Sequence, residues 1–156
     1  MLRIDIASLR RGANEVIFEP SADELDLDSD EFSGIRVDAD VDVRQDQVVV
    51  RFVATAEAHL ICDRTLRPFT EAVKGTYAML FSSRGETQVE GMDDVQSFSA
   101  SEPVIDITEA VRDTLILAVP TKRLAPGADE IEIPSRFGGQ ADGEIDPRWE
   151  ALRRLR

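Results

Sequence analysis

The chain has 156 residues, of which 31 are acidic and 18 basic, so its formal net charge at pH 7 is -13. This length can bury a core without disulfides or metal, and a mean hydropathy of -0.21 without a long apolar run excludes a transmembrane span. The negative field repels bare nucleic acid at long range and so argues against broad RNA wrapping. The acidity has two interpretations, a surface that receives a basic partner or a solvated face adapted to a salty cytoplasm.

The chain's start and its cysteine content predict a cytoplasmic protein. Residues 1–6 alternate apolar and charged side chains instead of placing an apolar segment after a basic one, so we expect no secretory signal. Cys62 is the only cysteine and therefore has no internal disulfide partner, as is usual in a reducing compartment. We expect one domain over residues 1–156, with a loop-rich, irregular or mobile segment at about 121–145.

Alternating apolar and polar residues predict short strands at 2–6 and 15–19. Between Asp23 and Glu31, six carboxylates surround Leu25 and Leu27. That composition fits either an acidic helical turn or an exposed connection, and we favour a loop or short strand.

The central part of the chain predicts three longer strands. Apolar and polar residues alternate regularly over 35–44 and 48–61, on either side of a turn near 45–47. We therefore expect a hairpin with one solvent-exposed face. A polar interruption at 62–68 precedes a third strand at 69–81. Residues 82–101 lack periodicity and predict an exposed excursion with room for a short strand. In the second strand, one face is expected to carry Val48, Val50, Phe52, Ala54, Ala56, Ala58 and Leu60.

Two helices are expected after these strands. The first covers about 106–118, with Asp106 or Thr108 as its cap and Pro120 ending it. The second is short, at about 147–155, with Pro147 at its first position. The predicted fold class is α+β, built on a mostly antiparallel β-sheet or a partly closed barrel.

Cys62 stands where one long strand ends and the next begins, a place typical of zinc-binding cysteines. A structural zinc site needs four nitrogen or sulfur ligands, and this chain offers only Cys62 and His59. As a nucleophile, Cys62 would need a base, but residues three apart on a strand point to opposite faces. We therefore predict a buried structural thiol, no metal, no cofactor and no catalytic residue, since no HExxH, GxSxG, Walker-type or GxGxxG motif is present.

Two groups of basic residues are candidates for RNA contact. Arg64, Arg67 and Lys74 lie near Phe69 and Tyr77 in the sequence, an arrangement that suits RNA. Ion pairing with the many carboxylates is the alternative that we favour. The second group is expected to dock onto the domain's own surface or onto RNA phosphates and contains Arg148, Arg153, Arg154 and Arg156.

Three motifs together resemble the YceD family, also called the large ribosomal RNA subunit accumulation protein family. Residues 62–69 resemble its C-x-R-C-L-x-P-[FY] motif, residues 117–120 its leucine-rich helix end and proline, and residues 146–155 its D-P-R-[FW]-x-x-L-x-x-L ending. The matching positions are Cys62, Arg64, Leu66, Pro68, Phe69, Pro120, Asp146, Pro147, Arg148, Trp149 and Leu152.

The departures from the family pattern concern metal binding. Thr65 stands at the position of the motif's second cysteine, and the further cysteines that many members carry downstream are missing. The resemblance therefore implies that a metal-binding version of the site has been lost. Packing of Trp149 and Leu152 would then have to hold the C-terminal segment, or the segment would be mobile.

The resemblance implies a role in the synthesis, processing or accumulation of large-subunit ribosomal RNA, without catalysis. Because the chain is acidic, we expect it to act through a basic ribosomal protein or the pre-ribosomal large subunit, and not at a membrane. The alternative is direct RNA binding by Arg64, Arg67, Arg148, Arg153 and Arg154. An enzyme using Cys62 or His59 is a third and weaker reading.

Overall fold

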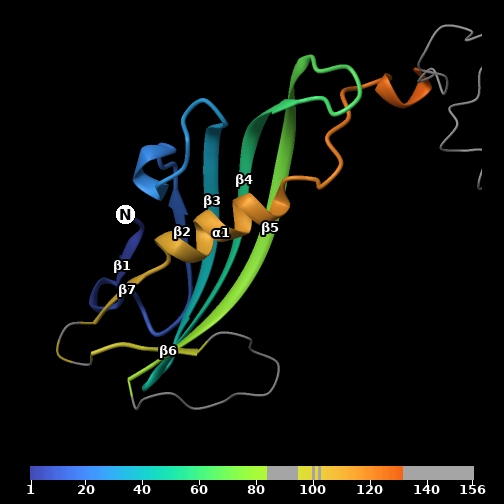
Figure 1. Ribbon diagram of the computed structural model, residues 1–156. Helices are drawn as coiled ribbons and strands as arrows, with labels where there is room; N and C mark the ends of the chain where they lie inside the picture. Colours follow the sequence, from blue (N-terminus) through green and yellow to red (C-terminus); the bar gives the residue numbers. More distant parts are fainter. Residues whose placement is uncertain (84–94, 100, 102, 132–156) are drawn as a thin grey trace, which may run out of the picture.

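The computed structural model describes residues 1–83, 95–99, 101 and 103–131 (Figure 1). The helices and strands within these residues are β1 Arg3–Asp5, β2 Gly12–Phe18, β3 Phe32–Val43, β4 Gln47–Ile61, β5 Pro68–Ser82, β6 Val95–Ser97, β7 Val104–Asp106 and α1 Thr108–Ala118, with 3-10 turns η1 Ile6–Ser8, η2 Asp23–Leu25 and η3 Ala128–Glu130.

The main sheet has five strands in the order β2-β3-β4-β5-β6. Its pairs are antiparallel except for β5 and β6, which run parallel. The sheet is open, with β2 and β6 at its edges, so the antiparallel arrangement is observed and the partly closed barrel is not. The α+β class predicted from the sequence is confirmed.

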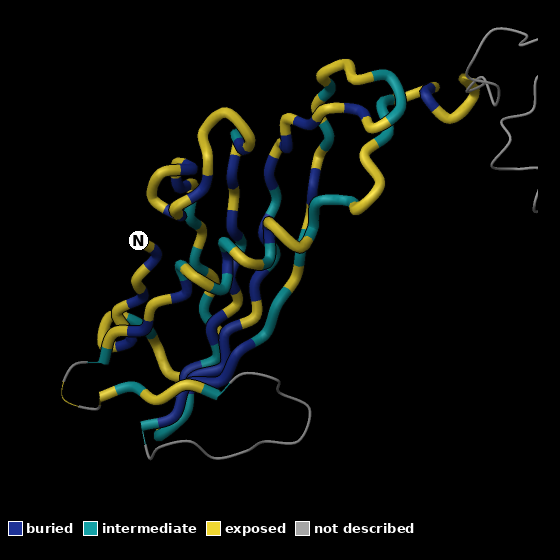
Figure 2. The backbone as a smooth tube through the Cα atoms, in the orientation of Figure 1, coloured by how far each residue is buried: buried dark blue, intermediate teal, exposed yellow. Residues whose placement is uncertain are grey.

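The hairpin of β3 and β4 follows the predicted alternation. Val37 faces Ala54 and Val41 faces Val50 across the pair. The predicted inward residues of β4, from Val48 to Leu60, are all buried, and Figure 2 shows the resulting alternation along the strands. Cross-strand pairs of β-branched and small residues thus form one apolar face of the sheet.

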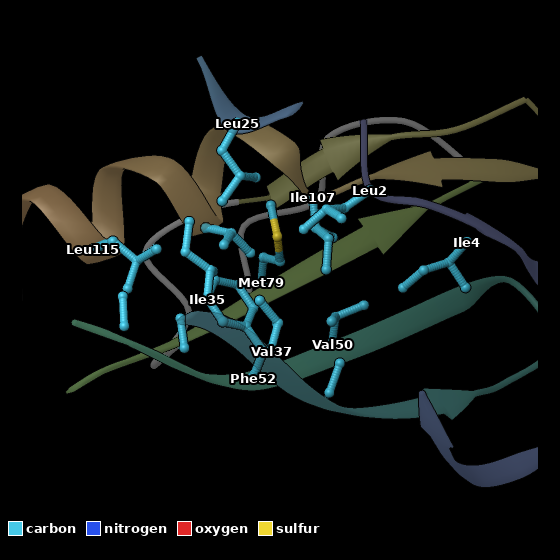
Figure 3. Packing of buried hydrophobic residues seen from close by; sticks show 14 of the residues in the cluster. Leu2, Ile4, Leu25, Ile35, Val37, Val50, Phe52, Met79, Ile107 and Leu115 are labelled. Carbon is cyan, nitrogen blue, oxygen red and sulfur yellow. The ribbon is translucent and has the colours of Figure 1, made fainter. Parts of the chain in front are cut away.

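Helix α1 lies across this apolar face (Figure 1). Ile107, immediately before the helix, and Val111 and Leu115 within it are fully buried, and Figure 3 shows Ile107 and Leu115 among the packed core side chains. Gly75 of β5 permits the close approach, because a Cβ at this position would collide with Thr114 Cγ2 and come within 2.9 Å of the Thr114 carbonyl oxygen. Burying these apolar side chains supplies the main stabilisation of this region.

The start of the chain packs beside the start of α1. β1 and β7 form a separate antiparallel pair, and Leu2 N–H donates to Thr108 Oγ1 at 2.6 Å. The strand at 104–106 is not predicted from the sequence, since it depends on a partner about a hundred residues away. The N-cap position is Ile107, which makes no side-chain cap, so neither predicted capping residue occupies it. Asp106 instead lies one residue earlier, and its Oδ1 accepts the Thr108 N–H at 2.9 Å.

Several boundaries differ from the sequence expectations. β2 begins at Gly12 because the strand continues its pairing to Val43, and residues 23–25 form a 3-10 turn that completely buries Leu25 instead of the favoured loop or strand. The short strand expected within 82–101 is β6. The expected helix at 147–155 and the part of 121–145 beyond Ile131 lie outside the described residues. No helix in the described part of the chain is long and apolar enough to cross a membrane.

Candidate functional site at the motif loop

The motif loop, residues 62–67, is a tight hairpin connection between β4 and β5. Cys62 N–H donates to the Arg67 carbonyl at 2.9 Å, and Leu66 N–H donates to the Cys62 carbonyl at 2.8 Å. This closure places the backbone of Leu66 in the left-handed region, with φ of 56°. The Leu66 side chain is 77% exposed. A residue with a Cβ costs about 1 kcal/mol in that conformation, and here no burial of the side chain offsets the cost.

The motif loop holds the segment that follows α1, residues 121–131, which we call the strap. Arg64 Nη1 donates to the carbonyl oxygens of Ala128 at 3.0 Å, Asp129 at 2.7 Å and Ile131 at 2.9 Å. Because Nη1 carries two hydrogens, one of them is shared between two of these three carbonyls at η3 and its end. A charged donor makes these bonds stronger than neutral ones.

A second connection joins the loop to the beginning of the strap. Asp63 N–H donates to the Arg123 carbonyl at 2.8 Å, and the Arg123 N–H donates back to Asp63 Oδ2 at 2.8 Å. The strap is therefore tied to the loop at both of its ends, through backbone groups that pair with Asp63 and Arg64.

Cys62 is fully buried at the base of the loop. The Thr65 hydroxyl and then the backbone N–H groups of Ala125, Thr65 and Arg64 lower the pKa of its thiol to about 7, outweighing the upward effect of burial. Thr65 Oγ1 is itself buried and has no hydrogen-bond partner of ordinary geometry among the described residues.

His59 takes part in a different set of contacts. Its Nε2 lies 2.8 Å from Ser33 Oγ and its Nδ1 lies 3.2 Å from Thr70 Oγ1, so both ring nitrogens are engaged with hydroxyl groups of neighbouring strands. The side chain is exposed on β4, whereas Leu60 and Cys62 are buried. This places His59 on the sheet face opposite the core, where it links three strands.

The residues present do not fit a zinc ion. Cys62 provides one sulfur, the alcohol of Thr65 stands where the motif has its second cysteine, and the His59 nitrogens already have hydroxyl partners. Zinc needs several thiolate or imidazole ligands for a structural site. In the described ranges no three His, Cys, Asp or Glu side chains are placed to hold a metal.

The predicted basic and aromatic patch is not assembled. Arg64 binds strap carbonyls, and Lys74 faces Thr55 on the sheet face opposite the core. Phe69 and Tyr77 are partly buried and pack against the core. Arg67 and Leu66 remain exposed at the tip of the motif loop.

Other members of the predicted site have different positions. Pro120 is half-buried two residues after the end of α1, and Pro68 starts β5. The residues of the closing motif lie outside the described part of the chain: Asp146, Pro147, Arg148, Trp149, Leu152, Arg153 and Arg154. Sequence reasoning missed the strap, because its contribution is made by backbone carbonyls that no side-chain pattern reveals.

These features define a class of protein: an open, mostly antiparallel sheet covered by one helix. A cysteine-containing loop at the end of the sheet forms hydrogen bonds to the strap that follows the helix. A family model described as "Large ribosomal RNA subunit accumulation protein YceD" matches residues 50–156. The chain belongs to the YceD family, which confirms the resemblance, and the family's description connects it with large-subunit ribosomal RNA. No curated protein and no solved structure matches the chain.

Proposed function

We propose that this protein supports the accumulation of large-subunit ribosomal RNA as a non-catalytic cytoplasmic factor that acts through protein contacts. The observation that carries the proposal is the family match over residues 50–156, which includes both the motif loop and the closing motif. The partner would be a basic ribosomal protein or the pre-ribosomal large subunit.

The charge distribution favours a protein partner over RNA. The formal net charge is -13, and Arg64, the basic residue central to the motif, is occupied with strap carbonyls. Arg36, Arg44 and Arg112 each form ion pairs with neighbouring carboxylates. These four arginines are thus already engaged within the protein and are less available to phosphate groups, which dominate the affinity of RNA-binding proteins.

Depletion of the protein tests this function directly. We expect a lower ratio of large to small ribosomal subunits, restored by the wild-type gene, and recovery of ribosomal proteins or pre-ribosomes in pull-downs at moderate salt. An unchanged subunit ratio after depletion would remove the proposed function. A normal ratio restored by Cys62→Ala and His59→Ala variants would support a non-catalytic role.

Direct RNA binding is the second candidate, favoured by the exposure of Arg67 beside Leu66 at the loop tip. It predicts an affinity for ribosomal RNA that falls steeply with salt and with Arg67→Ala, Arg153→Ala and Arg154→Ala substitutions. Arg64 is unsuitable for this test, because its replacement also disturbs the strap. Salt-sensitive binding of purified protein to RNA, lost in these variants, would replace the protein-contact proposal.

A further inference from the structure

A groove of about 1000 Å³ runs beside α1, between this helix, η2 and β5. We call it the α1 groove. Tyr77 and Met79 of β5 and Ala110, Thr114 and Leu117 of α1 contribute to its lining. Leu117 is 84% exposed, a large apolar side chain left uncovered on the helix that otherwise buries its apolar side chains against the sheet. The hollow thus combines apolar contact surface with enough room for a peptide.

The rim of the α1 groove is strongly acidic. Its carboxylates are Asp23, Glu24, Asp26, Asp106, Glu109 and Asp113, whereas the cationic groups in the lining are the Arg112 guanidinium and the N-terminal ammonium group. The latter donates to the Glu24 carbonyl at 3.2 Å. Negative charge therefore exceeds positive charge around the hollow.

Arg112 neutralises this rim only in part. Its guanidinium lies 2.9 Å from Asp113, 3.4 Å from Glu109 and 3.9 Å from Asp26. The three carboxylate side chains nevertheless remain 54%, 82% and 96% exposed, respectively. They are open to further cations from a partner, and the Arg112 pairs cost little to exchange because exposed ion pairs are weak.

The opposite face of the sheet shows that this charge pattern is not general. There Asp38 pairs with Arg36 at 2.8 Å, Asp42 pairs with Arg44 at 2.9 Å, and Asp40 stands opposite Arg51 in the strand register. Each of these three aspartates thus has an arginine beside it on that face, although Asp40 also faces Glu15 of β2. The α1 groove differs because hollow shape, apolar lining and excess negative charge coincide.

We infer that the α1 groove binds an extended, arginine- and lysine-rich segment of a partner protein. The cationic heads would meet the rim carboxylates, while their aliphatic stems and a neighbouring apolar side chain pack on the lining around Leu117. α1 has 11 residues and is about 16 Å long, a length that about five extended residues would span. RNA is the wrong occupant, because its phosphates would face the rim carboxylates. The assignment rests on the proposed function, since it names where the basic partner binds.

Binding of a labelled peptide of Arg, Lys and Leu residues to the full chain tests this assignment by fluorescence anisotropy at low salt. The groove variant is Asp26→Asn/Glu109→Gln/Asp113→Asn. Its matched control is Glu15→Gln/Asp40→Asn/Glu57→Gln, which removes the same charge from exposed positions outside the groove. Circular dichroism checks that both variants keep the wild-type fold.

The groove variant should weaken peptide binding about tenfold, because it removes three of the charge contacts, and the control should weaken it by less than about twofold. A peptide with Glu in place of Arg and Lys should not bind. Equal weakening in both variants would show diffuse charge attraction and overturn the inference. Undiminished affinity in the groove variant would overturn it as well.

A complementation experiment separates this inference from the proposed function. If depletion lowers the large-subunit ratio, and the groove variant restores it as fully as the control does, the groove assignment fails while the function stands. If depletion leaves the ratio unchanged, the function fails, and the peptide measurement alone decides whether the groove binds basic segments. Support requires that the control restores the ratio and the groove variant does not.

Discussion

Two regions of this protein are stabilised by different interactions, the contact between the sheet and α1 by apolar packing and the contact between the motif loop and the strap by hydrogen bonds. The sheet and α1 meet through apolar side chains: Leu115, Val111 and Ile107 are fully buried, and α1 packs on β4 and β5. Figure 3 shows Leu115 and Ile107 among these buried side chains. The motif loop and the strap meet through hydrogen bonds, mainly from Arg64 and Asp63 to backbone groups. Apolar packing tolerates little change of volume, whereas a surface network should fail locally when its central donor is removed.

The largest effect is expected at the contact between α1 and β5. Gly75→Ala should lower the free energy of unfolding by about 3 kcal/mol, because the new Cβ would lie against Thr114 and displace the helix. Denaturant unfolding measures this loss. Adding Thr114→Ala should recover part of it by removing the colliding Cγ2, while the nearby Thr114 carbonyl keeps the recovery incomplete. If Gly75→Ala unfolds at the same denaturant concentration as wild type, the close approach of α1 to β5 at this position is contradicted.

The second effect tests whether the strap depends on Arg64. Arg64→Ala leaves the carbonyls of Ala128, Asp129 and Ile131 without this donor, with an expected loss of about 2 kcal/mol. The loss should be local, so hydrogen exchange at Ala128 N–H and protease cleavage in the strap should accelerate more than exchange in β4. Arg67→Ala, an exposed arginine in the same loop, is the matched control and should change neither. Uniform acceleration through β4 would show that the strap is part of the cooperative core.

The two kinds of contact, apolar packing and hydrogen bonds to the backbone, also differ in how well the sequence predicts them. The alternation in β3, β4 and β5 and the helical period of α1 are local patterns, so strand faces, hairpin and helix could be predicted. The β1–β7 pair depends on partners distant in the chain, and the η2 turn buries Leu25 within a segment that looks merely acidic. The hydrogen bonds from Arg64 to the strap could not be predicted from the sequence, because their acceptors are backbone carbonyls, which every residue type has.

A smaller effect distinguishes Leu66 and Leu117, the two most exposed leucines in the described part of the chain. Leu66 lies at positive φ and Leu117 in the last turn of α1, and both side chains are largely in solvent. Leu66→Gly should raise the free energy of unfolding by about 0.5 kcal/mol, as relief of backbone strain exceeds the entropy that glycine adds to the unfolded chain. Leu117→Gly should lower it by up to about 1 kcal/mol. Thermal unfolding of both variants checks the opposite signs, and a destabilised Leu66→Gly would contradict the strain argument.

The smallest effect concerns the thiol at the base of the motif loop. Thr65→Val should raise the pKa of Cys62 from about 7 towards its ordinary value of 9.0, because it removes the group that lowers this pKa most. A lowered thiol pKa adds stability that is complete above 9.0 and is lost as the pH falls through about 7. The stability difference between wild type and Cys62→Ala should therefore grow as pH rises over this interval, and Thr65→Val should flatten it. Ultraviolet titration of the thiolate gives the pKa, and an unchanged value would exclude Thr65 as the cause.

The central claim is that Arg64 and backbone hydrogen bonds hold the motif loop and strap together without metal. Elemental analysis of the purified full chain, combined with unfolding in the presence and absence of a chelator, tests it most directly. We predict less than stoichiometric zinc and identical unfolding curves. One tightly bound zinc per chain, with a loss of stability when it is removed, would contradict the claim.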